Sequence, residues 1–172
     1  MTTAESGWVN AIKKVFLGVI NIRTIPNKKK FELSIFTQFY PPDYAATGQL
    51  IQELANELKK RGMKIHVFTG QPGYAFNSSK ASSLERSENL LVRRSRASRL
   101  WGNKIRGKAI NGVFFCLRSA IHLLKSCWRG KTILLTTAPP FLPAIGYLVN
   151  LCFGQPYICL IYDLYPDAVV EL

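Results

Sequence analysis

Residues 33–73 read LSIFTQFYPPDYAATGQLIQELANELKKRGMKIHVFTGQPG and contain a strand, a helix and a second strand in close succession. The first apolar run, residues 33–37, stops before a pair of prolines. A helix is predicted from Thr47-Gly48, because apolar residues then recur at steps of three and four, and basic residues and a glycine follow. A second strand at residues 64–69 completes a βαβ unit, which implies a parallel sheet with a right-handed crossover.

The alternation of strands and helices continues along the chain. After a polar loop, further strands are predicted at residues 89–94, 132–137 and 156–162, and helices from Ile110 onward and at residues 143–153. Residues 132–162 carry no charge and are long enough to span a membrane, but prolines and a turn interrupt them, and buried parallel strands produce the same apolar run. The pattern predicts an α/β domain with an open, doubly wound parallel sheet of the Rossmann-like kind.

The helix predicted from Ile110 is apolar on more than one face. One stripe at helical spacing consists of Ile110, Val113, Phe114, Leu117, Ile121, Leu124 and Trp128. Three further apolar residues, Phe115, Cys116 and Leu123, lie off that stripe. A helix that is apolar all round is either buried or in contact with lipid, and both environments stay open here.

The charge of the chain is concentrated in its centre. The net charge is +13, of which residues 80–131 contribute +11 and residues 1–30 contribute +5, while residues 132–172 contribute −3. Such a patch favours an anionic partner, which can be a phospholipid surface, a diphosphate-linked substrate or a nucleic acid. Nucleic acid is not expected, because no known nucleic-acid-binding signature accompanies the basic stretch. The expected membrane or anion contacts are Arg93, Arg94, Arg96, Arg99, Lys104, Arg106 and Lys108.

Residues 1–30 form a basic N-terminal extension. Within it, residues 8–22 have amphipathic helical spacing, and two interpretations stay open: a short helix on a membrane surface, or an extension without a defined role. Nothing in it resembles a secretory signal. The four cysteines have no metal-ligand spacing and are expected to be buried thiols in a reducing compartment; they are Cys116, Cys127, Cys152 and Cys159. A cytoplasmic protein without a bound metal is therefore expected.

Three polar segments follow predicted strands, at residues 39–48, 136–140 and 161–167. Open parallel sheets bind their ligands at these carboxyl ends. Gly48 would let a phosphate approach a helix N-terminus, but Thr-Gly at that position is also a common helix cap. Asp163 is the first charge after the charge-free run, and it suits either a carboxylate that orients or deprotonates a hydroxyl, or the cap of a following helix.

Residues 31–172 resemble the N-terminal part of family-4 glycosyltransferases, which have the GT-B fold. The resemblance rests on the strand, Tyr-Pro-Pro, glycine and helix order of residues 33–73, on Thr136-Thr137-Ala138-Pro139-Pro140, and on Asp163-Leu164-Tyr165-Pro166-Asp167. It is nearest to the enzymes that build bacterial exopolysaccharide, O-antigen and colanic-acid-type repeat units. Two departures are the single glycine of Thr47-Gly48, where many relatives have two, and Tyr165 in place of a tryptophan.

The resemblance implies roles for particular residues. Thr47 and Gly48 would lie in a glycine loop beside the donor diphosphate, and Asp163 would act near the acceptor hydroxyl as the catalytic residue. The expected acceptor cleft consists of Tyr40, Asp43, Tyr44, Thr137, Pro139 and Tyr165. The basic and apolar region 93–128 would face the membrane and a polyprenyl-diphosphate-linked acceptor.

The resemblance also implies a missing partner. In the family, a second domain binds the nucleotide-sugar donor, and transfer with retention takes place in the cleft between the two domains. Residues 31–172 correspond to the first domain, incomplete at its C-terminal end, so the donor domain is expected on a separate chain or in a longer protein. The expected function is acceptor binding at the inner face of the cytoplasmic membrane, with no activity alone and no cofactor besides the nucleotide sugar held by the second domain. The alternative is a non-catalytic, basic module that binds membrane surfaces.

Overall fold

A computed structural model describes residues 31–43, 45–72, 81–95 and 105–162, with side chains described from residue 110 in the last range. Several sequence-based predictions fall outside these residues: the N-terminal extension, the side chains of Arg106 and Lys108, and Tyr44, Arg96, Arg99, Lys104, Asp163 and Tyr165. These stay predictions.

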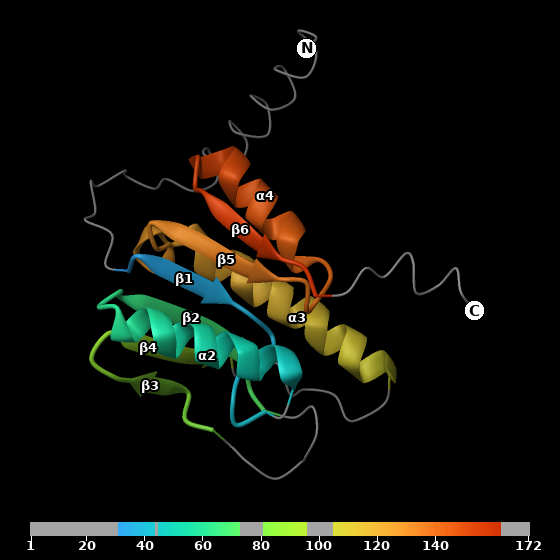
Figure 1. The fold of residues 1–172 in the computed structure, drawn as a ribbon. Coiled ribbons are helices and arrows are strands. Elements are labelled where there is room, and N and C mark those ends of the chain that lie inside the picture. The colour runs from blue at the N-terminus through green and yellow to red at the C-terminus, as the bar shows by residue number, and fades with distance from the viewer. Residues whose placement is uncertain (1–30, 44, 73–80, 96–104, 163–172) are drawn as a thin grey trace, which may run out of the picture.

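The described chain forms six strands and three long helices (Figure 1). The first βαβ unit consists of β1 (Leu33–Phe36), α2 (Ala46–Lys60) and β2 (Ile65–Gly70). The hairpin of β3 (Leu84–Arg86) and β4 (Leu90–Ser95) follows, and then α3 (Ile105–Leu124) and a 3-10 turn, η2 (Ser126–Trp128). The last elements are β5 (Thr132–Thr136), α4 (Leu142–Phe153) and β6 (Tyr157–Leu160). The predicted βαβ unit and the predicted strand–helix–strand after residue 131 are confirmed.

The strands form one sheet in the order β3-β4-β2-β1-β5-β6. All neighbours are parallel except β3, which pairs antiparallel with β4 at the edge. The sequence pattern predicts the parallel part and the doubly wound α/β class, and the structure confirms both. The sequence pattern misses β3, because the three residues of this strand are all exposed and show no alternation of apolar and polar side chains.

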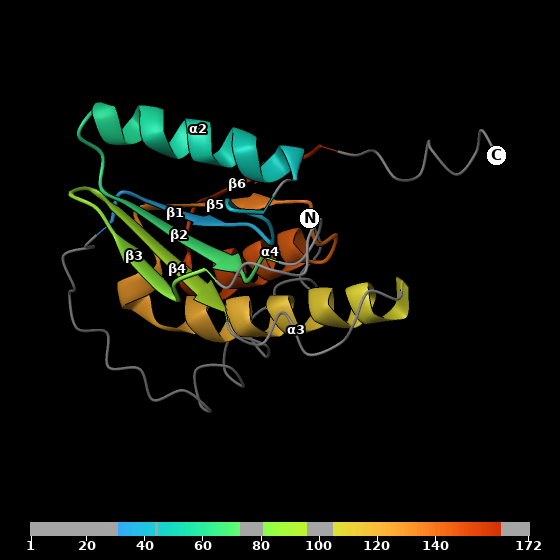
Figure 2. The same ribbon diagram turned by 90° about the horizontal axis from the view of Figure 1, so that it is seen from below.

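Helices cover both faces of the sheet. Figure 2 shows α2 on one face and α3 and α4 on the other. Alternate residues of β1 serve the two layers: Ile35 packs in the cluster that includes Ile51 and Ala55 of α2, and Phe36 packs in the cluster that includes Phe115 of α3. The core therefore consists of two apolar layers separated by the sheet, as a doubly wound domain requires.

The apolar stripe predicted for α3 is not the buried face of that helix. Its side chains Val113, Leu117 and Ile121 are 57%, 56% and 52% exposed, while Phe115 and Leu123, which lie off the stripe, are fully buried. Because α3 has apolar residues on both sides, helical spacing alone could not tell which side contacts the sheet. Among the described residues, no helix is both long enough and apolar enough to cross a bilayer.

The prediction of four buried cysteines is wrong for three of them. Cys116 on α3 is buried, Cys127 in η2 is exposed, and Cys152 and Cys159 are half-buried; none forms a disulfide. The reason is position, since Cys127 lies in a surface turn and Cys159 lies in β6, the strand at the edge of the sheet.

Candidate functional site: the carboxyl ends of the strands

The carboxyl ends of three neighbouring strands are tied together by the backbone of Gln38, which follows β1. Its carbonyl oxygen accepts hydrogen bonds from the Gly70 N–H at 3.1 Å and the Thr69 hydroxyl at 3.2 Å, both in β2. Its own N–H donates to the Ala138 carbonyl, beyond β5, at 3.2 Å. The ends of β2, β1 and β5 are therefore held in fixed relation, as a binding site built on strand ends requires.

Thr137 extends this arrangement to β6. Its N–H donates to the Leu160 carbonyl at 3.2 Å, and its hydroxyl oxygen accepts from the Tyr162 N–H at 3.3 Å. A hydroxyl that accepts one hydrogen bond still has its own O–H to donate. Thr137 is half-buried, so this O–H can be offered to a ligand hydroxyl or phosphate at the strand ends.

The helix α3, which covers one face of the sheet, also reaches these strand ends. A Cβ atom placed on Gly112 would lie 3.3 Å from Cβ of Pro139 and 4.0 Å from Oε1 of Gln38. The half-buried carboxamide of Gln38 therefore lies between the strand ends and α3. Sequence analysis missed this residue, although the same signal that marks Thr137, a polar residue directly after a buried strand, could have found it.

The N-terminus of α2 shows why residue 48 is a glycine. A Cβ atom there would lie 3.2 Å from backbone atoms of Phe39 and Tyr40, tighter than side chains normally pack. The N-cap of α2 is Ala45, which makes no side-chain cap bond, so the interpretation of Thr47 as the cap is wrong. Thr47 lies in the first turn instead. The close packing of Gly48 accounts for the glycine, and the predicted contact of Thr47 and Gly48 with a donor diphosphate stays a prediction.

Several side chains predicted for the acceptor cleft are buried in the structure. Tyr40, Asp43 and Pro139 each expose only a small part of their surface. Burial raises the pKa of Tyr40 to about 12, with Arg94 opposing the shift and Glu85 adding to it. Tyr40 borders a hollow of about 180 Å³ that is also lined by residues of α2 and of the β3–β4 hairpin, so its ring lies on the α2 side of the sheet. Among the residues of the predicted acceptor cleft that the structure describes, Thr137 is half-buried and the others are buried.

Arg94 is not a surface contact, in contrast to the prediction. Its side chain is 1% exposed and forms an ion pair with Glu85. It also donates to the carbonyl oxygens of Ser82 at 2.9 Å and Pro41 at 2.6 Å. A buried guanidinium needs such partners, because an unpaired buried charge is costly. Alternation along β4 explains the difference from Arg93, which is exposed and lies over the ring of Trp128 at 4.9 Å.

Comparison with known proteins gives one informative likeness. No protein-family model and no curated protein matches the sequence. Among solved structures, sucrose-phosphate synthase from Thermosynechococcus elongatus matches with a TM-score of 0.57 and 13% sequence identity. The likeness is in the fold. The match covers 81% of this chain and 34% of that protein, so the chain spans about a third of the length of the protein that it resembles.

This likeness agrees with the strand order and the helix layers described above. Sucrose-phosphate synthase is a glycosyltransferase of the GT-B class, and a Rossmann-like α/β domain is what the two chains share. At this level of identity the match establishes architecture alone, and substrates are not transferred with it.

Proposed function

We propose that this chain is the acceptor-binding half of a retaining, family-4-type glycosyltransferase that transfers a sugar from a nucleotide donor to a lipid-linked or polysaccharide acceptor. The observation that carries the proposal is that Gln38 and Thr137 are held by hydrogen bonds at adjoining strand ends of a Rossmann-like sheet. The carboxamide of Gln38 and the hydroxyl of Thr137 are suited to hydrogen-bond sugar hydroxyls. The fold shared with sucrose-phosphate synthase supports the same class of enzyme.

In this proposal the chain supplies the acceptor side only. The donor diphosphate would approach the N-terminus of α2 from a second domain, where free backbone N–H groups favour an anion. Asp163, which follows β6 in sequence, would orient or deprotonate the acceptor hydroxyl. Half a cleft cannot position both substrates, and such positioning lowers a barrier by about 7–11 kcal/mol, so the chain alone is expected to be inactive.

A second candidate function, a module that binds anionic membrane surfaces, is favoured by one observation. The exposed apolar stripe of Val113, Leu117 and Ile121 lies on α3 together with the exposed Arg118. Apolar side chains next to cations are typical of helices that lie at a lipid interface. The two functions are compatible, because an enzyme that uses a lipid-linked acceptor must work at the membrane.

The transfer reaction tests the first proposal. Purified chain is assayed for sugar transfer alone and with a GT-B donor-side domain, supplied as a separate protein or by fusion. We expect no transfer above the no-enzyme control from the chain alone and measurable transfer from the combination. In the active combination, Asp163→Asn should lower the rate by about 10²–10⁴, the size of a general-base effect. Asp167→Asn is the matched control, and a rate loss at Asp167 with none at Asp163 would show that the wrong carboxylate was chosen.

A further inference from the structure

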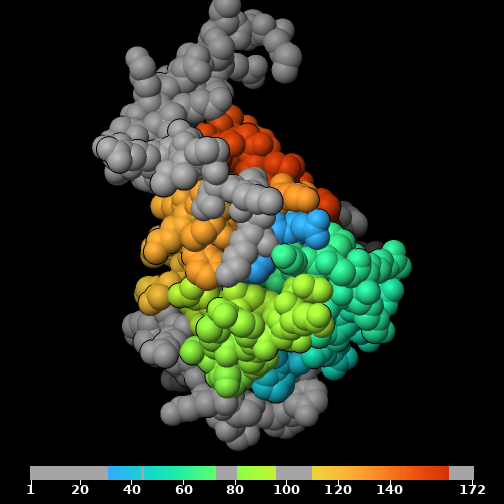
Figure 3. Space-filling model, turned by 90° about the vertical axis from the view of Figure 1, so that its left-hand side faces the viewer, coloured from blue at the N-terminus to red at the C-terminus, as the bar shows by residue number. Residues whose placement is uncertain are grey.

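A cavity of about 570 Å³ lies between the β3–β4 hairpin and the C-terminal half of α3. Its lining includes five basic residues, of which Arg94 is paired with Glu85; the other four are Arg86, Arg93, Arg118 and Lys125, and His122 and Trp128 border the cavity beside them. Figure 3 shows this face of the molecule, with the hairpin in yellow-green beside the orange C-terminal part of α3. Gln38, Gly112 and Thr137 do not border the cavity, so it is distinct from the candidate site at the strand ends. Its volume is within the usual range for small-molecule sites.

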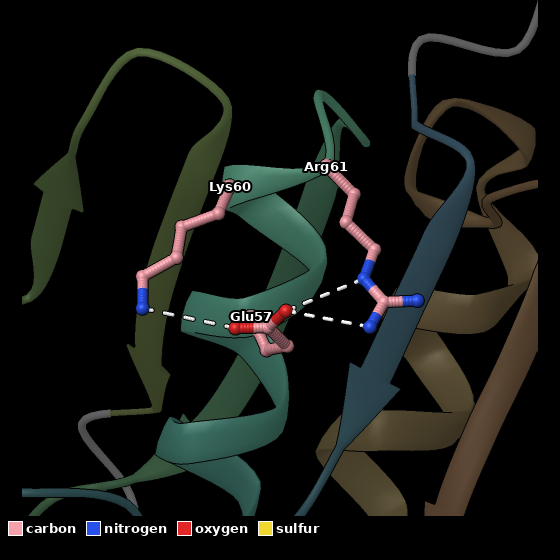
Figure 4. Close-up of polar contacts among 3 residues, drawn as sticks. All are labelled: Glu57, Lys60 and Arg61. Carbon is pink, nitrogen blue, oxygen red and sulfur yellow. Dashed lines mark hydrogen bonds and ion pairs between the residues drawn. The ribbon is translucent and has the colours of Figure 1, made fainter.

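Four of these lining residues are cations without a counter-ion in the described part of the chain. Arg86, Arg93, Arg118 and Lys125 are exposed, form none of the ion pairs there, and no Asp or Glu lines the cavity with them. The contrast is Glu57 on α2, which pairs with Lys60 at 3.7 Å and Arg61 at 3.3 Å (Figure 4). Like charges gathered around one hollow repel each other and raise the local concentration of anions.

A buried imidazole borders the cavity between two aromatic rings. His122 is 9% exposed, borders the cavity, and its Nε2 atom is buried without a hydrogen-bond partner. Its ring stacks on Phe68 at 4.4 Å and on Trp128 at 4.8 Å, so it cannot turn freely toward another partner. The ring is therefore a rigid wall beside the cations, and its buried Nε2 atom is not itself open to the cavity.

Arg93 is held in place before any ligand arrives. The guanidinium of Arg93 lies over the ring of Trp128, and the Trp128 carbonyl oxygen accepts a hydrogen bond from the hydroxyl of Ser34 at 2.8 Å. Trp128 also packs against His66, with ring centroids 5.0 Å apart. A guanidinium held in place loses little entropy when it binds, and its planar donors fit phosphate oxygens.

We propose that this cavity is a binding site for a phosphate mono- or diester group. Arginine and lysine side chains are the charged donors that such a group prefers, and four of them border the cavity without a counter-ion in the described part of the chain. The phosphate could belong to a soluble metabolite or to a lipid headgroup. Ile121 both lines the cavity and ends the exposed apolar stripe of α3, so a phosphate with an apolar chain attached fits the same place. The inference does not depend on glycosyltransferase activity.

The test is a calorimetric titration of the full chain at constant ionic strength, with inorganic pyrophosphate and with glycerol 3-phosphate. A second arm measures co-sedimentation with phosphatidylcholine vesicles that contain phosphatidic acid. The cavity variant is Arg93→Gln with Arg118→Gln. The matched control is Lys60→Gln with Arg61→Gln, which removes the same number of cations on the opposite face of the sheet. Arg118→Gln alone is a second variant, since Arg93 also packs on Trp128.

We expect the cavity variants, but not the control, to weaken binding by about tenfold or more, as the loss of charge-assisted hydrogen bonds predicts. Binding of the soluble phosphates would identify a metabolite-type site, and binding of phosphatidic acid vesicles alone would identify a headgroup site. Equal weakening in cavity and control variants, or no binding in either arm, would overturn the proposal. The variants leave Gln38 and Thr137 unchanged. The phosphate proposal can therefore fail while the acceptor proposal stands.

Discussion

At the scale of single residues, the consecutive arginines of β4 have opposite roles. Both border the cavity, but Arg94 is buried and paired with Glu85, Ser82 and Pro41, whereas Arg93 is exposed and lies over the ring of Trp128. We expect Arg94→Met to lower the free energy of unfolding by about 2 kcal/mol, because two carbonyl groups lose their partner. Arg93→Met is the matched control and should cost less than about 1 kcal/mol, the value of an exposed cation–π contact. Urea denaturation measures both, and equal costs would contradict the assignment of the two side chains.

His66 and His122, whose stacked rings lie 5.4 Å apart, make the stability of the domain depend on pH. Burial lowers the pKa of His66 to about 3, helped by His122 and Arg93, and burial lowers the pKa of His122 to about 3, helped by Arg93 and Lys125. Both are neutral in the folded chain, whereas in the unfolded chain they gain protons near pH 6.5. The unfolded state therefore binds more protons, and stability falls as pH drops from about 6.5 toward 3, by up to about 1.4 kcal/mol per pH unit for each histidine.

Denaturation between pH 7.5 and 5 checks this dependence above the range in which carboxylates titrate. We expect His122→Phe, which keeps an aromatic ring between Phe68 and Trp128, to remove about half of the slope. A stability that does not change over this range, or an unchanged slope in the variant, would contradict the buried, neutral state of the pair.

The residues of the site show how far sequence alone leads. The sequence predicts a polar segment at residues 136–140 after a buried strand, and the structure places Thr137 directly after β5; Gln38 follows β1 by the same rule, and the role of Thr137 in an acceptor cleft stays a prediction. The burial of Tyr40 and Arg94 could not be found in this way. Arg94 in β4 reaches the Pro41 carbonyl in the loop after β1, 53 residues away, and that contact exists only once β4 and β1 are both placed beside β2.

At the scale of elements, α3 is the helix with two apolar faces. The face with Phe115 and Leu123 packs on the sheet, and the face with Val113, Leu117 and Ile121 is exposed. Sequence periodicity locates such a helix but cannot choose between its faces. β3 was missed for a different reason, since three exposed residues hold their place only by pairing with β4.

The exposed face of α3 makes a specific prediction about membranes. We expect Leu117→Gln to leave the free energy of unfolding within about 0.5 kcal/mol, as for most surface changes. The same variant should weaken binding to anionic vesicles by about tenfold, because burial of a leucine in lipid contributes about 1.5–3 kcal/mol. The matched control is Leu50→Gln on α2, since Leu50 is 51% exposed on the opposite face of the sheet. Vesicle sedimentation that shows equal losses for both variants would contradict a membrane role for α3.

At the scale of the whole molecule, the two ligand regions lie in different parts of one domain. The candidate site with Gln38 and Thr137 lies at the carboxyl ends of β1, β5 and β6, and the cationic cavity lies between the β3–β4 hairpin and the C-terminal half of α3. We propose that the sugar acceptor binds at these strand ends and, separately, that a phosphate group binds in the cavity. The same proposal assigns the nucleotide sugar to a second domain.

The measurement that tests this division most directly is an NMR titration of ¹⁵N-labelled chain with two ligands in parallel. One is a short-chain polyprenyl-diphosphate sugar, as the acceptor, and the other is a nucleotide sugar. The account predicts that the acceptor shifts the backbone amide signals of Gln38 and Thr137 and that Gln38→Ala or Thr137→Ala weakens its binding, while the nucleotide sugar alone leaves both signals unchanged. Shifts of these signals by the nucleotide sugar, with none from the acceptor, would contradict the account.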